Sequence, residues 1–232
     1  MANQARMLTP RVLIITFVFV VVAPFLPLLI SQRWNWWQAW VYAIVSIAAF
    51  VISRALAARR NPDLLAERSR FLQHADAKPW DKKLAPLVGL GGALIPLVAG
   101  LDARFGQPAG FSLAVELAAL AVLLAGYALA SYALIENAWF SGMVRLQTDR
   151  GQQVISSGPY RWVRHPGYAG ALLAYLATPL LLASPWALLP ALFLAGVVIV
   201  RTRLEDQTLQ AELPGYAAYA QRVRRRLAPG IW

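Results

Sequence analysis

Six apolar segments, separated by short polar stretches, dominate the chain. They run over residues 12–30, 36–56, 84–101, 111–135, 168–182 and 185–200. A helix that crosses a bilayer needs about 20 apolar residues, and the first four segments meet or approach that length. The last two are shorter and meet at Ser184-Pro185, as the two arms of a helical hairpin would. The pattern predicts an all-α, polytopic integral membrane bundle of about six spans that includes a C-terminal helical hairpin.

The basic residues divide the connecting segments into rich and poor ones, in strict alternation. The first loop holds only Arg33, the third only Arg104, and the turn at Ser184 none. The N-terminal tail holds Arg6 and Arg11, and the second loop, the fourth loop and the C-terminal tail carry the other Lys and Arg residues. Cytoplasmic segments of membrane proteins are enriched in Lys and Arg. We therefore expect both termini in the cytoplasm, and a protein of the bacterial inner membrane with its active site at the cytoplasmic face.

Composition agrees with a membrane location and narrows the chemistry. Apolar residues make up 59% of the 232 residues and charged residues only 14%, where a soluble domain has about 25% charged residues. The net charge of +11 is explained by a lipid surface without a nucleic-acid partner, because the basic residues sit in particular loops. With no cysteine and only two histidines, a histidine-rich metal or haem site is not expected, although carboxylates could still hold a magnesium ion. No residue is predicted as a metal ligand.

The polar sequence suggests two functional regions. Residues 1–135 form a predicted four-span membrane region, and residues 136–232 form a predicted cofactor-binding core with the hairpin and cytoplasmic C-terminal helices. Within the first region, residues 61–72 predict a short interfacial helix with Asn61 as its N-cap and Pro62 at its first position. Such a helix either connects two spans at the bilayer surface or covers a site from the cytoplasmic side.

A dense polar and aromatic cluster at residues 158–168 is the first candidate site. Pro166 is suited to begin a helix and moves His165 out of the helical conformation. The amides of Gly167, Tyr168 and Ala169 would then be free at the positive end of the helix dipole, where anions bind. Arg161, Arg164 and His165 lie beside them. Together they predict a carboxylate or phosphate ligand.

The end of the last apolar segment is the second candidate site. Glu205 and Asp206 follow it directly, and Arg201 precedes Glu205 by four residues. This spacing fits an intrahelical ion pair on a solvated helix, but adjacent carboxylates also suit ribose hydroxyls, an amine or a sulfonium. After a break at Leu213-Pro214-Gly215, one helical face carries Tyr216, Tyr219 and Arg222. Asn137, at the end of the fourth segment, either bonds a ligand or caps the helix.

The order and spacing of these residues resemble the isoprenylcysteine carboxyl methyltransferase family, to which the phospholipid N-methyltransferases and the bacterial methanethiol S-methyltransferases look related. The resemblance covers residues 137–232. Its matching positions are Ser157, Gly158, Tyr160, Arg164, His165, Pro166, Tyr168, Gly170, Glu205, Asp206, Gly215, Tyr216, Tyr219, Arg222 and Val223. One departure is Asp206, where the family usually has a second glutamate.

The resemblance implies that S-adenosylmethionine binds at the cytoplasmic face, inside a membrane helical fold. Its implied cofactor-binding residues are Asn137, Tyr160, Arg164, His165, Pro166, Tyr168, Gly170, Glu205 and Asp206. Arg222 would orient the acceptor, and Glu205 or Tyr219 would act as a base for an amine or thiol acceptor. The carboxylate of an isoprenylcysteine-like substrate is the favoured acceptor. The alternatives are a sterol-type membrane reductase that uses NADPH, which shares the histidine motif, and a membrane scaffold without enzymatic activity.

Overall fold

The fold was analysed in a computed structural model that describes residues 10–71, 73–106, 110–228 and 232. Arg6 and Leu72, which entered the sequence predictions, lie outside these ranges. The described residues form helices and connecting loops, with no strand among them. The helices are α1 (Pro10–Phe17), α2 (Ala23–Ser31), α3 (Trp37–Arg60), α4 (Pro62–Ser69), α5 (Asp81–Phe105), α6 (Leu113–Glu136), α7 (Pro166–Leu181), α8 (Leu188–Glu212) and α9 (Tyr216–Arg222). The predicted all-α fold is confirmed.

Within the described residues, four helical stretches are long and apolar enough to cross a membrane. They are 10–31, which joins α1 and α2 through a π-helical turn at Val18–Val22, and the helices α3, α5 and α6. Helix α7 has 16 residues, which extend over about 24 Å. Helix α8 is longer, but its second half carries Arg201, Arg203, Glu205 and Asp206. These two helices form the predicted hairpin, and their crossing of the bilayer stays a prediction.

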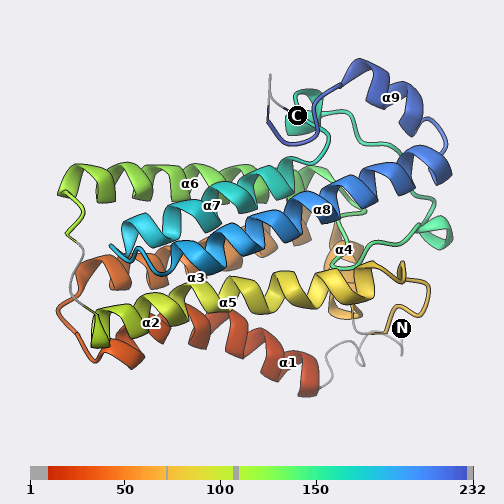
Figure 1. The fold of residues 1–232 in the computed structure, drawn as a ribbon. Helices are drawn as coiled ribbons and strands as arrows, with labels where there is room; N and C mark the ends of the chain where they lie inside the picture. Colours follow the sequence, from red (N-terminus) through yellow and green to blue (C-terminus); the bar gives the residue numbers. More distant parts are fainter. Residues whose placement is uncertain (1–9, 72, 107–109, 229–231) are drawn as a thin grey trace.

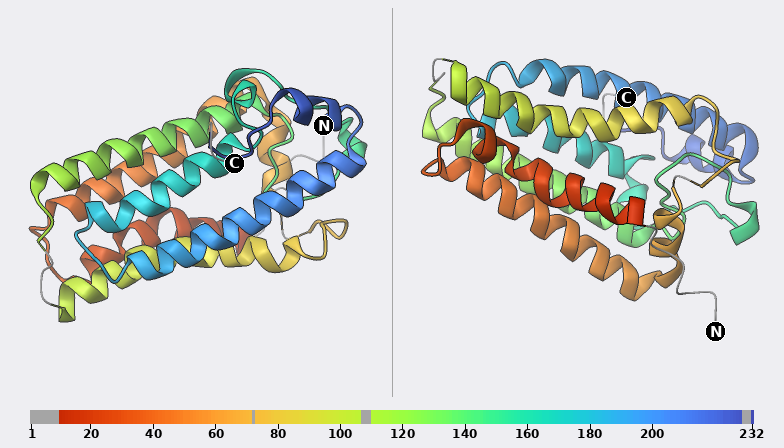
Figure 2. Two further views of the ribbon diagram at one scale, coloured as in Figure 1. Left: turned by 45° about the horizontal axis from the view of Figure 1, so that its top comes forward. Right: turned by 90° about the horizontal axis from the view of Figure 1, so that it is seen from below.

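The long helices lie side by side in one bundle (Figures 1 and 2). The main pairs are α6 with α7, α2 with α5, and α5 with α8. Leu28, Ile95, Leu123, Leu181 and Leu194 are buried in the core between them. The predicted boundary at residues 135/136 assigns α6 and α7 to different regions, although these two helices pack along each other.

The two ends of the bundle differ in character. One end carries α4, α9 and the start of α7, and the other carries only the turns between α2 and α3, α5 and α6, and α7 and α8 (Figure 1). Arg33 and Arg104 belong to the turn end. The segments rich in Lys and Arg meet at the opposite end, as the alternation along the sequence predicted.

Helix α4 packs on the end of the bundle. It covers Pro62–Ser69, a shorter range than the predicted 61–72. Asn61 precedes it but makes no side-chain cap, because its amide donates to the carbonyl of Ile135 over 2.9 Å. Leu64 is fully buried and packs in a cluster with Ala57 and Leu134. The apolar face of α4 therefore contacts α3 and α6, and the helix braces the polar end of the bundle.

Candidate functional site

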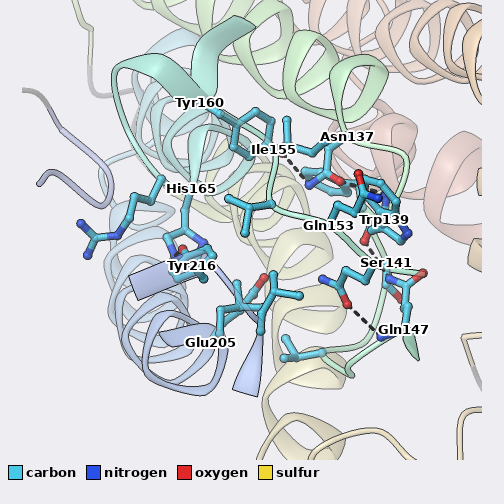
Figure 3. A pocket seen from close by; sticks show the side chains of 18 of the residues that line it. Asn137, Trp139, Ser141, Gln147, Gln153, Ile155, Tyr160, His165, Glu205 and Tyr216 are labelled. Atoms are coloured by element: carbon cyan, nitrogen blue, oxygen red, sulfur yellow. Dashed lines mark hydrogen bonds between the residues drawn. The ribbon is translucent and has the colours of Figure 1, made fainter. Parts of the chain in front are cut away.

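A cavity of about 100 Å³ opens at the polar end of the bundle. One wall comes from the segment that follows α6, and the facing wall comes from the starts of α7 and α9 and the second half of α8 (Figure 3). The sequence-predicted residues that line it are Asn137, Tyr160, Arg164, His165, Tyr168, Glu205 and Tyr219. The cavity thereby brings together the regions around His165 and around Glu205, which are separated by about forty residues in the chain.

The start of α7 has the geometry that the proline predicts. His165 is the N-cap with φ −126° and ψ 61°, outside the α region, and Pro166 occupies the first turn. The backbone amides of Gly167 and Tyr168 lie in this turn beside the cavity, at the positive end of the helix dipole. The expectation for Ala169 was wrong, because its amide donates to the carbonyl of His165 over 3.1 Å as the first regular helical bond.

Asp206 is the centre of a buried charge network. It is fully buried and accepts two hydrogen bonds from Arg164, of 2.6 and 2.8 Å. His165 Nε2 lies 3.2 Å from the same carboxylate. Tyr216, Gln210 and Arg226 donate to it as well. Burial opposes ionisation, but the hydrogen bonds from His165, Arg164 and Arg226 hold the pKa of Asp206 well below its usual range.

This network changes the interpretation of the adjacent acids. Asp206 does not line the cavity, and its oxygens are occupied by protein donors, so it orients Arg164 and His165 from behind the wall. Arg164 also donates to the carbonyl of Val223 over 2.7 Å. Its guanidinium therefore joins α8 to the C-terminal tail. The arginine of the motif therefore organises the site, and its contact with a ligand stays a prediction.

Glu205 is the carboxylate that faces the cavity. Tyr168 donates to its Oε2 over 2.6 Å, which joins the first turn of α7 to α8. Arg201 does not form the suggested intrahelical ion pair with Glu205. Arg201 instead makes two hydrogen bonds of 2.6 and 2.9 Å to the buried Asp81 at the start of α5. Asp81 also accepts from the amide of Val144 in the cavity wall.

Three buried tyrosines frame the apolar side of the cavity. Tyr219 donates to the carbonyl of Tyr160 over 2.7 Å, and Asn137 donates to the Tyr160 hydroxyl over 3.1 Å. Tyr216 stands edge-on to Tyr219, with 5.4 Å between ring centroids. Burial raises the pKa of all three phenols above the usual value. They are neutral at physiological pH and serve as hydrogen-bond donors and aromatic walls.

The segment after α6 is the part of the site that sequence reasoning missed. It contributes Trp139, Phe140, Ser141, Gln147, Gln153 and Ile155 to the cavity. Gln147 fixes its fold by donating to the carbonyl of Trp139 over 2.8 Å. Only the aromatic pair directly after α6 gave a sequence signal, because the glutamines have no motif around them. Asn137 is part of this internal fixing, since its Oδ1 accepts from the amide of Trp139.

Helix α4 and the following loop hold this segment against the bundle. Arg145, which also lines the cavity, forms ion pairs with Glu67, Asp76 and Asp149 at 2.8 to 3.0 Å. Burial opposes the charge of Arg145, but these carboxylates raise its pKa above the usual value. Arg68 donates to the carbonyl of Phe140 over 2.9 Å. The N-terminal half of the chain therefore shapes one wall of the site.

Besides Asp206, three predicted site residues lie away from the cavity lining. Pro166 is buried and begins α7. Gly170 lies where α7 crosses α6, and a Cβ there would come within 2.6 Å of the backbone nitrogen of Ala130, so helix packing requires the glycine. Arg222 is exposed at the end of α9 and does not line the cavity. These three residues do not line the cavity, and their role in ligand binding stays a prediction.

Fold and site together define a helical membrane protein with a polar cavity at one end of its bundle. Residues 108–211 match the sequence model of the isoprenylcysteine carboxyl methyltransferase family. The matched range includes α6, the cavity segment, α7 and most of α8, and so contains His165 and Glu205. Over this range, the chain is similar to that family of membrane methyltransferases.

A curated relative gives a second, more local similarity. The uncharacterized protein YpbQ of Bacillus subtilis (strain 168) is 39% identical over 61 residues. The aligned stretch covers 26% of this chain and 36% of that relative. The chain therefore matches only about a third of the length of the relative.

Proposed function

We propose that the protein is a membrane-embedded methyltransferase that uses S-adenosylmethionine and acts on a lipophilic or small acceptor. One observation carries the proposal: within the family-matched range, the His165 turn and the Glu205 region meet at one cavity through the bond from Tyr168 to Glu205. The histidine motif, which reductases share, thereby lies at one site with Glu205, one of the two acids in the family resemblance.

The chemistry of the lining suits S-adenosylmethionine group by group. The methionine carboxylate suits the free amides of Gly167 and Tyr168 at the start of α7. Glu205 suits the amine or the ribose hydroxyls. The rings of Trp139, Phe140, Tyr160 and Tyr216 offer faces for an adenine and for a sulfonium cation. A cavity with one carboxylate, free helix amides and several aromatic rings fits a cationic nucleoside.

When bound, S-adenosylmethionine supplies an activated methyl group for in-line displacement by the acceptor. The protein's part is to hold both reactants in line and to exclude water, and alignment alone is worth up to about 7–11 kcal/mol. His165, held by Asp206, and Glu205, held by Tyr168, are fixed for this task. A carboxylate acceptor needs no proton transfer, because its oxygen attacks as an anion.

The carboxylate of an isoprenylcysteine-like compound remains the favoured acceptor, and the apolar helices beside the cavity would solvate its tail. An amine or a thiol would have to lose a proton to a base. The raised pKa of Tyr219 argues against its phenolate in that role, which leaves Glu205. Near the cavity wall, Arg68 has no carboxylate within ion-pair distance in the described part of the chain. It is a better placed cation for an anionic acceptor than Arg222.

The proposed topology has six spans, with the cavity and both termini at the cytoplasmic face of a bacterial inner membrane. It rests on the concentration of Lys and Arg at the end of the bundle that carries the cavity. Helices α7 and α8 would form the fifth and sixth spans. Cysteine labelling of residues introduced into the turn at 182–187 and into α9, from each side of the membrane, tests this arrangement.

Two measurements test the function. In a calorimetric titration of the purified protein, S-adenosylmethionine should bind and reduced nicotinamide dinucleotide phosphate should not. The reverse result would favour the reductase, and no binding of either would favour a scaffold. Membrane extracts given a labelled methyl donor should then yield a labelled product only when the protein is present. Identification of that product gives the acceptor and the methylated atom.

A further inference from the structure

A second cavity, of about 320 Å³, lies at the turn end of the bundle, opposite the candidate active site. It is formed by the connection between α2 and α3, the last turns of α5 and the turn between α7 and α8. Its polar lining residues are Arg33, Asn35, Gln38, Asp102 and Ser184. Nothing in the methyl-transfer proposal uses this cavity.

The cavity contains one positive and one negative side chain that do not neutralise each other. Arg33 is exposed and has no carboxylate within 4.0 Å among the residues that the structure describes. Asp102 is fixed at the end of α5, because its Oδ2 accepts a hydrogen bond of 2.6 Å from Ser184. A ligand with an anionic and a cationic group would satisfy both side chains at once.

The surroundings indicate the depth of this cavity in a membrane. Trp34, Trp37 and Trp186 at the same end of the bundle are 56%, 41% and 64% exposed. Tryptophan is enriched where a membrane helix passes through the headgroup layer. Trp36 and Trp37 themselves line the cavity. The molecules present at this depth in a bilayer are phospholipid headgroups.

We propose that this cavity binds the headgroup of a phospholipid that carries both a phosphate and a primary ammonium. Arg33 binds the phosphate, since a guanidinium presents two parallel donors to such an oxyanion. Asp102, held in place by Ser184, accepts from the ammonium group. Trp36 and Trp37 contact the glycerol and upper acyl carbons.

Arg104 provides an internal comparison at the same end of the bundle. It donates to the carbonyl of Ile30 over 2.8 Å and lies outside the cavity lining. If basic residues on this face attracted lipid only by their charge, Arg33 and Arg104 would contribute equally. The proposed site requires Arg33 alone.

The test is a titration of the purified protein with three phospholipids of identical acyl chains, read by native mass spectrometry. Phosphatidylethanolamine should bind more tightly than phosphatidylcholine, whose quaternary amine donates no hydrogen bond, and than phosphatidylglycerol, which has no amine. Arg33→Gln should weaken binding of all three about tenfold or more, as the loss of a charge-assisted hydrogen bond predicts. Arg33→Lys should restore part of it, and Arg104→Gln should have no effect.

Asp102→Asn addresses the ammonium contact, and it should remove the preference for phosphatidylethanolamine over phosphatidylcholine. The thermal unfolding midpoint of each variant, measured without added lipid, identifies any variant that is misfolded. If Arg33→Gln is misfolded, Arg33→Lys replaces it in the comparison. Equal losses in Arg33→Gln and Arg104→Gln, or a lipid preference that survives Asp102→Asn, would overturn the proposal. Binding of S-adenosylmethionine at the other end of the bundle is not altered by any of these changes.

Discussion

The neighbouring acids Glu205 and Asp206 are expected to fail in different ways when each is replaced by its amide. Asp206→Asn removes a buried charge that five side chains contact, among them Arg164 and Arg226. It leaves those guanidiniums without their counter-ion in a site where Asp206 is fully buried. Removing one partner from a buried ion pair costs about 3–5 kcal/mol of unfolding free energy.

Glu205→Gln leaves an amide oxygen that still accepts from Tyr168, so it should cost about 0.5–1.5 kcal/mol of stability at most. Its larger effect falls on the ligand, because Glu205 faces the cavity. One hydrogen bond to a charged group is worth about 1.5–3 kcal/mol, which corresponds to a dissociation constant raised about 10- to 150-fold.

Thermal unfolding in detergent measures the first effect, and calorimetric titration with S-adenosylmethionine measures the second. Unfolding should shift strongly for Asp206→Asn and little for Glu205→Gln. The affinity of folded protein should fall for Glu205→Gln. If Asp206→Asn were as stable as the wild type, or if Glu205→Gln bound the cofactor normally, the separation of a structural and a ligand-facing acid would be refuted.

Three further predictions follow from single contacts. The native pKa of Asp206 lies below its unfolded value of about 3.9. Its contribution should therefore be complete above about pH 5 and decline progressively as the pH falls through about 4 towards the lower native pKa. Unfolding midpoints of wild type and Asp206→Asn should converge in acid, and a constant gap would contradict this. Gly170→Ala should lower the unfolding free energy by about 1–3 kcal/mol, because the added carbon overpacks against Ala130. The control, Gly196→Ala in α8, has nothing within 4 Å of the added carbon and should be neutral or stabilising. Equal unfolding midpoints of the two variants would disprove the close crossing. Arg222→Ala should leave methyl transfer unchanged, because Arg222 is exposed and lies outside the cavity. A loss of turnover with intact cofactor affinity would instead support the acceptor role that the family resemblance implies.

The sequence by itself determined the all-helical fold, the helical hairpin and the start of α7 at Pro166. These features depend on local rules, since apolar length, proline geometry and charge distribution act within one segment. It also indicated that the His165 turn and the acids of α8 belong to one site. The bond from Tyr168 to Glu205 and the contacts of Asp206 agree with that inference.

Only the tertiary structure decided which of two adjacent acids faces the cavity. Neighbouring helix positions point about 100° apart, so the packing of α8 against α7 and α9 buries Asp206 and leaves Glu205 at the wall. The pairing of Arg201 with Asp81 joins residues 120 positions apart, and the Gln147 wall is folded by its own hydrogen bonds. Such long-range partners have no local signature, because their proximity arises only when the whole bundle has assembled.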